Sequence, residues 1–231
     1  MQLTTALYRY GFLFATLVFG IVIWGFWPSF YGHPLSLKTN MHYVHATATT
    51  LWIMLLVTQP LLIRLNNRSL HKTMGKLTYL IFPLMIVTGW FLIQSRQHAL
   101  TEVDDFSYGF FYLIVQSTFV ETLFYGLGLY YRKEPAMHGR WMLATAFPLL
   151  PAATDRLLGR IFYENPLAAQ YTGWAVADLV LVVLSIWDWR THKKLNVFPI
   201  ALVIMIIHHT DWYFVGQIPA WHHFADWFAA L

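Results

Sequence analysis

Long apolar runs alternate with short polar loops along the whole chain. A helix needs roughly 20 mostly apolar residues to cross the hydrocarbon core of a membrane, and seven runs come close to or exceed that length. Their approximate bounds are 11–28, 42–63, 76–95, 107–131, 140–158, 172–189 and 196–216. Because the runs are continuous rather than alternating, they favour helices over the strands of a transmembrane barrel. The pattern predicts an all-α integral membrane bundle of seven transmembrane helices, forming one domain over residues 1–231.

The last segment, residues 217–231, is too short to cross a membrane. Pro219 suits the first turn of a helix. Ile218, Trp221 and Phe224 would fall near one stripe of that helix. This pattern is typical of a helix that lies in the plane of the membrane surface. We therefore expect a C-terminal interfacial amphipathic helix.

Lys and Arg are concentrated in alternate loops. Eleven of the fifteen lie near the N-terminus or around the loops that follow the second, fourth and sixth apolar runs. Short loops that are rich in Lys and Arg stay on the cytoplasmic side of a membrane. The distribution predicts a cytoplasmic N-terminus and a C-terminus on the outer side.

Composition narrows the class of protein further. Of the 231 residues, 58% are hydrophobic and 11% are charged, whereas a soluble domain carries about 25% charged residues. An ordinary soluble enzyme is therefore excluded. The net charge of +4 gathers on no single basic face, so the lipid bilayer is the expected partner and nucleic acid is not. The chain has no cysteine, which excludes disulfides, iron–sulfur clusters, thiolate metal sites and cysteine nucleophiles.

Histidines and carboxylates inside the predicted spans are costly in a membrane, and each is a candidate for function. Those expected in its outer half are His42, His45, Asp155, Asp178, His208, His209 and Asp211. Several helices would thus direct imidazole and carboxylate groups into one layer. Glu121 lies deeper, within the fourth apolar run.

One chemistry that uses such a layer is axial ligation of haem b, in which two histidines from facing helices hold the iron without any cysteine. His45 with His208 or His209 would supply the two imidazoles. The run that follows His45, Ala46–Thr50, is slim among bulky aromatic residues and would leave room for a flat porphyrin. His208 and His209 point about 100° apart on a helix, so we expect only one of them to face the interior.

A second chemistry is a zinc or copper site with nitrogen and oxygen ligands. His42 and His45 lie three residues apart and share a helix face. His208 or His209 and the carboxylate of Asp211 would complete the ligand set.

The remaining carboxylates are candidates for catalysis. In a metal-dependent hydrolase, Asp178 or Asp155 would act as the general base on metal-bound water. Glu121 would relay protons or brace two helices as a hydrogen-bonded acid. The alternatives without a cofactor are a buried hydrogen-bond network around the histidines and an ion-pair network that joins Asp155, Arg156 and Asp178.

Two further histidines, His71 and His138, begin the third and fifth spans on the cytoplasmic side, each among Lys or Arg. If they face one another, they would ligate a second, inner haem. The same basic collar would also suit a quinone or a lipid headgroup, because helix N-termini favour anions. A third interpretation is that the basic residues around these histidines anchor the helix ends to the membrane by contacting lipid phosphate.

Two blocks of the sequence resemble uncharacterised bacterial families of polytopic membrane proteins. The first block is HATATTLWIMLLVTQPLLIRLNNRSLHKTMG, from His45 to Gly75, and the second is MHGRWMLATAFPLLPAATDR. This resemblance implies the bacterial inner membrane. More remotely, His45 on one side followed by His71 on the other is similar to the cytochrome b561 arrangement of two haems near opposite faces. That similarity implies an outer haem on His45 with His208 or His209, and an inner haem on His71 and His138.

The sequence thus predicts a membrane redox protein that binds haem b, or less favourably copper or another metal, in the outer half of the bilayer. Its partner in electron exchange would be a quinol or a periplasmic protein. A zinc-dependent intramembrane hydrolase that acts on a lipid is the first alternative. A structural subunit of a membrane complex is the second.

Overall fold

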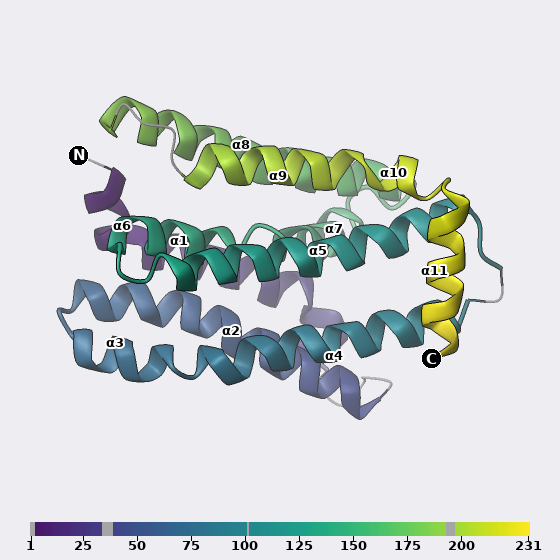
Figure 1. The fold of residues 1–231 in the computed structure, drawn as a ribbon, viewed down its shortest axis with the longest axis horizontal. Helices are drawn as coiled ribbons and strands as arrows, with labels where there is room; N and C mark the ends of the chain where they lie inside the picture. Colours follow the sequence, from purple (N-terminus) through teal and green to yellow (C-terminus); the bar gives the residue numbers. More distant parts are fainter. Residues whose placement is uncertain (1–2, 34–38, 101, 193–196) are drawn as a thin grey trace.

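A computed structural model describes residues 3–33, 39–100, 102–192 and 197–231, and Figure 1 shows its fold. The chain is all-helical, with 83% of its residues in helices, and the described residues contain no strand. The elements, in chain order, are α1 (Leu3–Gly25), a π-helical turn (Trp27–Tyr31), α2 (Asn40–Arg64), α3 (Arg68–Gly75), α4 (Thr78–His98), α5 (Asp105–Tyr130), α6 (Pro135–Ala144), α7 (Leu150–Leu158), α8 (Pro166–His192), α9 (Val197–Thr210), α10 (Trp212–Val215) and α11 (Pro219–Ala230).

Five of the helical segments in the described residues are long and apolar enough to cross a membrane. They are Asn40–Arg64, Arg68–His98, Asp105–Tyr130, Pro166–Arg190 and Val197–Val215. Each of them overlaps one of the runs predicted from hydrophobic pattern. The all-helical membrane character of the protein follows from these five segments.

The other two predicted spans take different forms. The apolar part of α1, Arg9–Gly25, is shorter than the five long segments. The predicted span 140–158 is divided between α6 and α7, which are separated by turns at residues 145–149. Pro148 and Pro151 explain this break, because proline has no N–H to donate to the helix and its ring clashes with the preceding turn.

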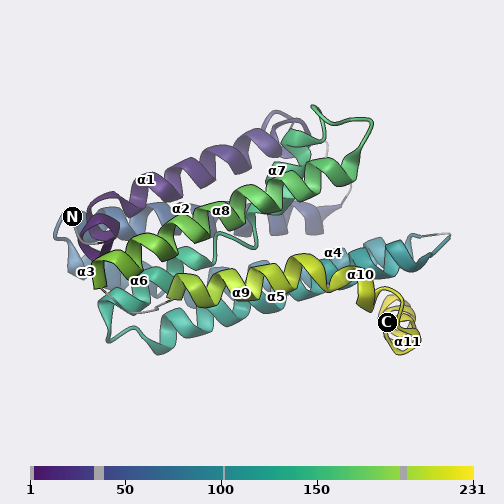
Figure 2. The same ribbon diagram turned by 90° about the horizontal axis from the view of Figure 1, so that it is seen from above.

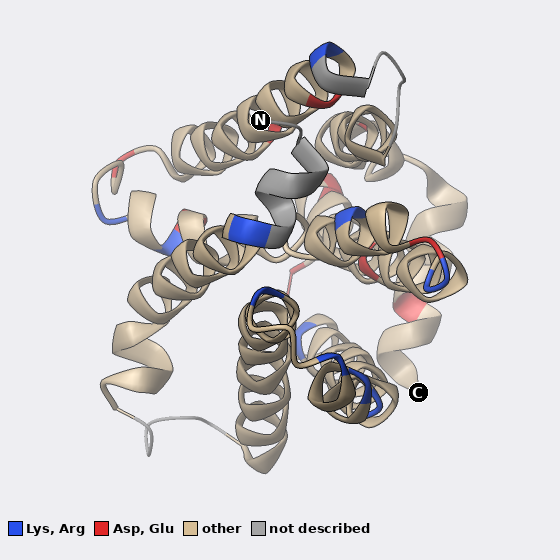
Figure 3. Ribbon diagram, turned by 90° about the vertical axis from the view of Figure 1, so that its left-hand side faces the viewer, with Lys and Arg blue, Asp and Glu red and all other residues tan. Residues whose placement is uncertain are grey.

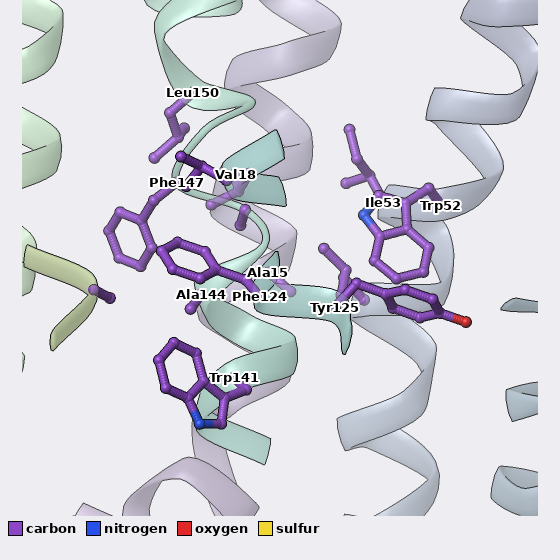
Figure 4. Packing of buried hydrophobic residues seen from close by; sticks show 14 of the residues in the cluster. Ala15, Val18, Trp52, Ile53, Phe124, Tyr125, Trp141, Ala144, Phe147 and Leu150 are labelled. Atoms are coloured by element: carbon purple, nitrogen blue, oxygen red, sulfur yellow. The ribbon is translucent and has the colours of Figure 1, made fainter. Parts of the chain in front are cut away.

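The elements pack as a bundle around one main apolar core, to which α1, α2 and α4 to α9 all contribute buried side chains. Within it α2 packs against α1 and α4, and α7 packs against α1 and α8. Figure 4 shows part of the core, where Phe124 and Phe147 lie together and Trp52 lies beside Tyr125. Trp52, Phe124 and Phe147 are completely buried. The apolar aromatic side chains therefore hold the short α6 and α7 in place among longer helices.

The two ends of the bundle differ in charge. At one end, which we call the basic end, the basic residues lie at the end of α2, along α3 and its C-cap, and in the α5–α6 connection. They are Arg64, Arg68, Lys72, Lys76, Arg132 and Lys133. Figure 3 looks onto this end and shows the Lys and Arg residues at the ends of the helices. Helix α1 begins at the basic end, whereas α11 lies at the opposite end (Figures 1 and 2).

Helix α11 crosses the opposite end of α4 and α5 rather than extending the bundle (Figure 1). Trp221 and Phe228 pack against Phe111, and the indole N–H of Trp221 donates to the backbone oxygen of Tyr108 at 2.9 Å. Nearby, Asp104 caps the first turn of α5. Two hydrogen bonds from Ser107 lower the pKa of that carboxyl from its ordinary value. The bond from the Ser107 hydroxyl has the larger effect and the bond from its backbone N–H the smaller one.

Candidate functional site

The principal candidate site is a cavity of about 900 Å³ at the basic end. Helices α2 to α6 supply its wall. Much of the lining is apolar and includes Trp52, Leu55, Ile63, Leu129 and Leu143. Ligand pockets are typically concavities of this size, with mostly apolar walls and a few polar groups.

Cations gather on the same cavity. Arg68, Lys72, Lys76 and Arg132 all contribute to its lining. Among the described residues, no acidic side chain lines it. Apolar walls and cationic side chains together suit a ligand that is flat or hydrophobic and carries acidic groups.

His71 and His138 line this cavity from α3 and α6, respectively. Their ring centroids are 6.4 Å apart, and the ring planes are nearly perpendicular at 86°. The structure therefore brings these two histidines close together on one cavity, and their predicted role as ligands of one haem stays a prediction.

Local sequence explains why the two imidazoles meet. Asn66 has a positive φ of 56°, a conformation that asparagine tolerates better than most residues, and this allows a tight turn from α2 into α3. The Asn67 side chain then accepts a hydrogen bond from the N–H of Leu70 and caps α3. Pro135 begins α6, as proline often begins a helix. Both histidines therefore lie in the first turn of a helix.

Neighbouring groups orient both rings. The Nδ1 of His138 lies 2.7 Å from the backbone oxygen of Gly128. Because that oxygen can only accept, Nδ1 carries the proton and Nε2 is left as an acceptor. The amide of Gln59 is assigned from its hydrogen-bond network. Its NH2 group donates to the backbone oxygen of His71 at 3.1 Å and to His71 Nδ1 at 2.5 Å, so Nδ1 of His71 is an acceptor in this arrangement.

The histidines of α9 belong to a second polar region, in the half of the bundle nearer the opposite end. His208 Nε2 lies 2.7 Å from Ser117 Oγ on α5. His209 Nδ1 lies 3.1 Å from Asp178 Oδ2 on α8, and its ring stacks on Trp174. The expectation that only one of the two histidines faces the interior is wrong, because both are buried, one against α5 and the other against α8.

Asp211 and the histidines of α2 have other partners. Asp211 Oδ2 accepts hydrogen bonds from Tyr112 and Gln116, at 3.0 and 2.8 Å. His45 Nδ1 lies 3.1 Å from the backbone oxygen of Met85 on α4. Among the hydrogen bonds of the described residues, the His42 side chain makes one. It joins His42 Nδ1 to Oγ1 of Thr39, the N-cap of the same helix, at 2.7 Å.

The structure does not bring His45 together with the histidines of α9. Helix α2 packs chiefly against α1, α3, α4 and α6, whereas α9 packs against α5, α6, α8 and α10. Within the described ranges, no three histidine, aspartate or glutamate side chains form a group that could hold a metal ion. An outer haem or metal site on His42, His45, His208, His209 and Asp211 therefore stays a prediction.

The predicted catalytic carboxylates also lie apart. Asp178 pairs with His209, and Asp155 lies beside Gly173, at the start of α8. Arg156 lies over the ring of Phe26 at 4.2 Å. The ion pairs found among the described residues, Arg140–Asp188, His209–Asp178 and His222–Asp105, do not include Asp155 with Arg156. Glu121 is 5% exposed, and its Oε1 has no hydrogen-bond partner among the described residues.

Sequence reasoning missed one buried ion pair. Arg140 of α6 donates from Nε and Nη2 to the carboxylate of Asp188 on α8, at 2.9 and 2.6 Å. Arg140 also lines the cavity. In the sequence, Arg140 stands at the start of the fifth apolar run, among the basic residues near the fourth connection. The signal that was overlooked is Asp188 itself, an acid between two tryptophans in WDWR.

Comparison with family models, with curated proteins and with solved structures finds no match to this chain. The resemblances to bacterial polytopic families and to cytochrome b561 therefore stay predictions. Support for a function comes from the geometry of the cavity and its two histidines.

Proposed function

We propose that this protein is a membrane redox protein that binds haem b in the cavity at the basic end, with His71 and His138 as the axial ligands. One observation carries the proposal: two imidazoles from different helices lie 6.4 Å apart and line one cavity with mostly apolar walls. Two histidines are the usual ligands of an electron-transferring b-type haem, and no cysteine is required.

The spacing of the rings supports a shared metal. Imidazole nitrogens bind transition metals at about 2 Å, so two rings that share one ion must lie close together. The centroids of His71 and His138 are 6.4 Å apart, and these two side chains would hold the iron.

The hydrogen bond of His138 supports the same role. A metal-binding histidine almost always donates its other N–H to an acceptor, which fixes the tautomer and the direction of the ring. His138 donates from Nδ1 to the backbone oxygen of Gly128, so Nε2 is the nitrogen available for a metal.

The chemistry of the wall supports haem over a bare ion. Haem b has a flat apolar macrocycle and two propionate groups. Leu55, Leu56 and Leu143 offer contacts for the macrocycle, and Arg68, Lys72 and Arg132 offer cations for the propionates. When bound, haem would supply one-electron transfer, and this chain would orient it and exclude water from its faces.

Seven membrane crossings fit this assignment. Helix α1 begins at the basic end and the chain finishes at the opposite end (Figures 1 and 2), as an odd number of crossings requires. Counting α1 and the broken α6–α7 pair with the five long segments gives seven. The positive-inside rule then puts the basic end in the cytoplasm, and α11 on the outer surface of what we expect to be a bacterial inner membrane. A quinol or a periplasmic protein would exchange electrons with it.

A quinone or a lipid headgroup is the second candidate ligand. The same cations and apolar walls favour either ligand, and histidine donates or accepts hydrogen bonds as readily as it binds iron. A quinone or headgroup differs from haem in one respect: it does not require both imidazoles to bind the same iron atom.

The absorption spectrum of the purified protein tests the proposal. We expect a Soret band, with α and β bands that sharpen on reduction by dithionite. His71→Ala and His138→Ala should each lose these bands, whereas His98→Ala, an exposed histidine that bonds to Ala229, should keep them. A colourless wild-type protein would overturn the haem assignment, and if that protein retained bound quinone or lipid phosphate, the second candidate would stand instead.

A further inference from the structure

A line of polar side chains follows α5 outside the haem cavity. We call it the α5 polar stripe and define it as Tyr112, Gln116, Ser117, Glu121 and Tyr125. Residues four apart on a helix are neighbours on its surface, so Ser117, Glu121 and Tyr125 follow one side of α5. Such a series is unusual in a helix whose other side chains are mostly apolar.

The end of the stripe away from the cavity contacts α9 and the residue that follows it. Tyr112 and Gln116 both donate to Asp211 Oδ2. Asp211 is only partly buried, and its Oδ1 is without a hydrogen-bond partner in the described ranges. That oxygen is itself buried, so the carboxylate keeps one interior oxygen that can bind a proton or a water molecule.

His208 continues the line from Ser117. The Ser117 hydroxyl donates its proton to the backbone oxygen of Leu113 at 2.8 Å. His208 Nε2 must therefore be the donor in its 2.7 Å contact with Ser117 Oγ. His208 is 1% exposed, and its Nδ1 accepts from no group in the described part of the chain. An imidazole that takes a proton at one nitrogen and releases one from the other is a proton relay.

Glu121 occupies the middle of the stripe. Its side chain is buried, and its Oε1 lacks a protein partner in the described ranges. Leaving such an oxygen without hydrogen bonds in a membrane interior would cost several kcal/mol. Water or a mobile proton would satisfy it, as buried water satisfies polar groups in other proteins.

The other end of the stripe reaches the cavity. One turn beyond Glu121, the hydroxyl of Tyr125 donates to Thr78 Oγ1 at 3.0 Å. Thr78 lines the haem cavity. Tyr112 and Tyr125 are thirteen residues apart, which is about 20 Å along a helix, or roughly two-thirds of the hydrocarbon core. The cavity covers much of the remaining distance to the basic end.

We propose that the α5 polar stripe, together with His208 and Asp211, is a proton path between the opposite end of the bundle and the cavity. The proton would pass from Asp211 by way of His208, Ser117, Glu121, Tyr125 and Thr78 to the cavity. Direct hydrogen bonds join His208 to Ser117 and Tyr125 to Thr78. Water molecules would carry the proton from Asp211 to His208 and across Glu121, where the described residues show no direct contact. Each group releases one proton for each proton that it receives, so only N–H and O–H bonds form and break and nothing is oxidised. The path does not depend on what the cavity binds.

Proton uptake by proteoliposomes tests this path. Vesicles that contain the protein and an internal pH-sensitive dye are given a potassium diffusion potential with valinomycin, and the change of internal pH is followed. We expect the wild type to take up protons faster than protein-free vesicles. Glu121→Gln keeps the size of the side chain and removes its acid, and it should lower the protein-dependent rate by at least about tenfold. Glu102→Gln, at an exposed residue, should leave it unchanged.

A second variant covers the case in which Glu121→Gln fails to fold. Tyr125→Phe removes only the hydroxyl that bonds to Thr78, and it should also slow proton uptake. Wild-type uptake equal to that of protein-free vesicles would overturn the path. Full uptake by a folded Glu121→Gln variant would also overturn it. If that variant does not fold, full uptake by Tyr125→Phe would have the same consequence. Haem content is measured on the same preparations, so a protein with haem but no proton uptake would contradict the path alone.

Discussion

Arg140 and Asp188 are the most deeply buried pair of opposite charges that the structure describes. Their side chains are 2% and 1% exposed, and two nitrogens of the guanidinium meet two oxygens of the carboxylate. This bidentate geometry is the strongest form of such a pair. It ties α6, which carries His138, to α8. The ion pair therefore holds one wall of the cavity in position.

Breaking this pair should destabilise the protein. Arg140→Leu leaves the carboxylate of Asp188 buried without its cation, which typically costs about 3–5 kcal/mol. The free energy of unfolding in detergent measures the loss. The double variant Arg140→Leu, Asp188→Leu should recover much of it, because no buried charge is left. A single variant as stable as the wild type would show that the pair is not buried in the native protein.

The number of haems in each chain distinguishes the inner site from the predicted outer one. If His71 and His138 hold the only haem, the wild type binds one, and His45→Ala and His209→Ala keep it. We expect this result, because His45 bonds to α4 and His209 bonds to Asp178 of α8. Two haems in the wild type, with one lost in either variant, would restore the outer site.

At the scale of single helices, Gly25 marks the place where α1 meets α7. A Cβ atom added there would lie 2.5 Å from the backbone oxygen of Ala153, which a backbone cannot easily avoid. Gly25→Ala should therefore lower the free energy of unfolding by about 1–3 kcal/mol, in the range of overpacked sites. Gly20→Ala is the matched control on the same helix, because a Cβ there meets nothing within 4 Å. Equal stability of the two variants would contradict the packing of α1 on α7.

Hydrophobic pattern predicted the long helices well, because a run of apolar residues in a membrane has few alternatives to a helix. It did not predict that the structure divides the span 140–158 into α6 and α7. The four prolines at 135, 148, 151 and 166 were visible in the sequence, but apolar content alone does not reveal whether a proline bends a helix or ends it.

The site was harder to predict than the helices. His71 and His138 were recognised as a pair because both open helices on the same side, each among cations. The partners of His45 and His209 were not predicted, because helix order along the chain does not determine which helices pack together. Asp188 was overlooked for the same reason, since its partner lies 48 residues away.

At the scale of the whole molecule, the orientation in the membrane is open to a direct test. The chain has no cysteine, so a single introduced cysteine is the only site for a thiol reagent. Lys133→Cys lies at the basic end, and Glu164→Cys lies in the loop between α7 and α8. With a membrane-impermeant maleimide on intact cells, we expect labelling of Glu164→Cys alone, and of both after lysis. Labelling of Lys133→Cys in intact cells would reverse the topology.

Electron paramagnetic resonance of the oxidised protein tests the central claim most directly. Two imidazoles on one ferric iron give a low-spin signal, and ring planes near the 86° of His71 and His138 make that signal strongly anisotropic. We predict such a signal in the wild type and its loss in His71→Ala and in His138→Ala. A protein without haem, or a high-spin ferric signal that neither substitution alters, would contradict the assignment.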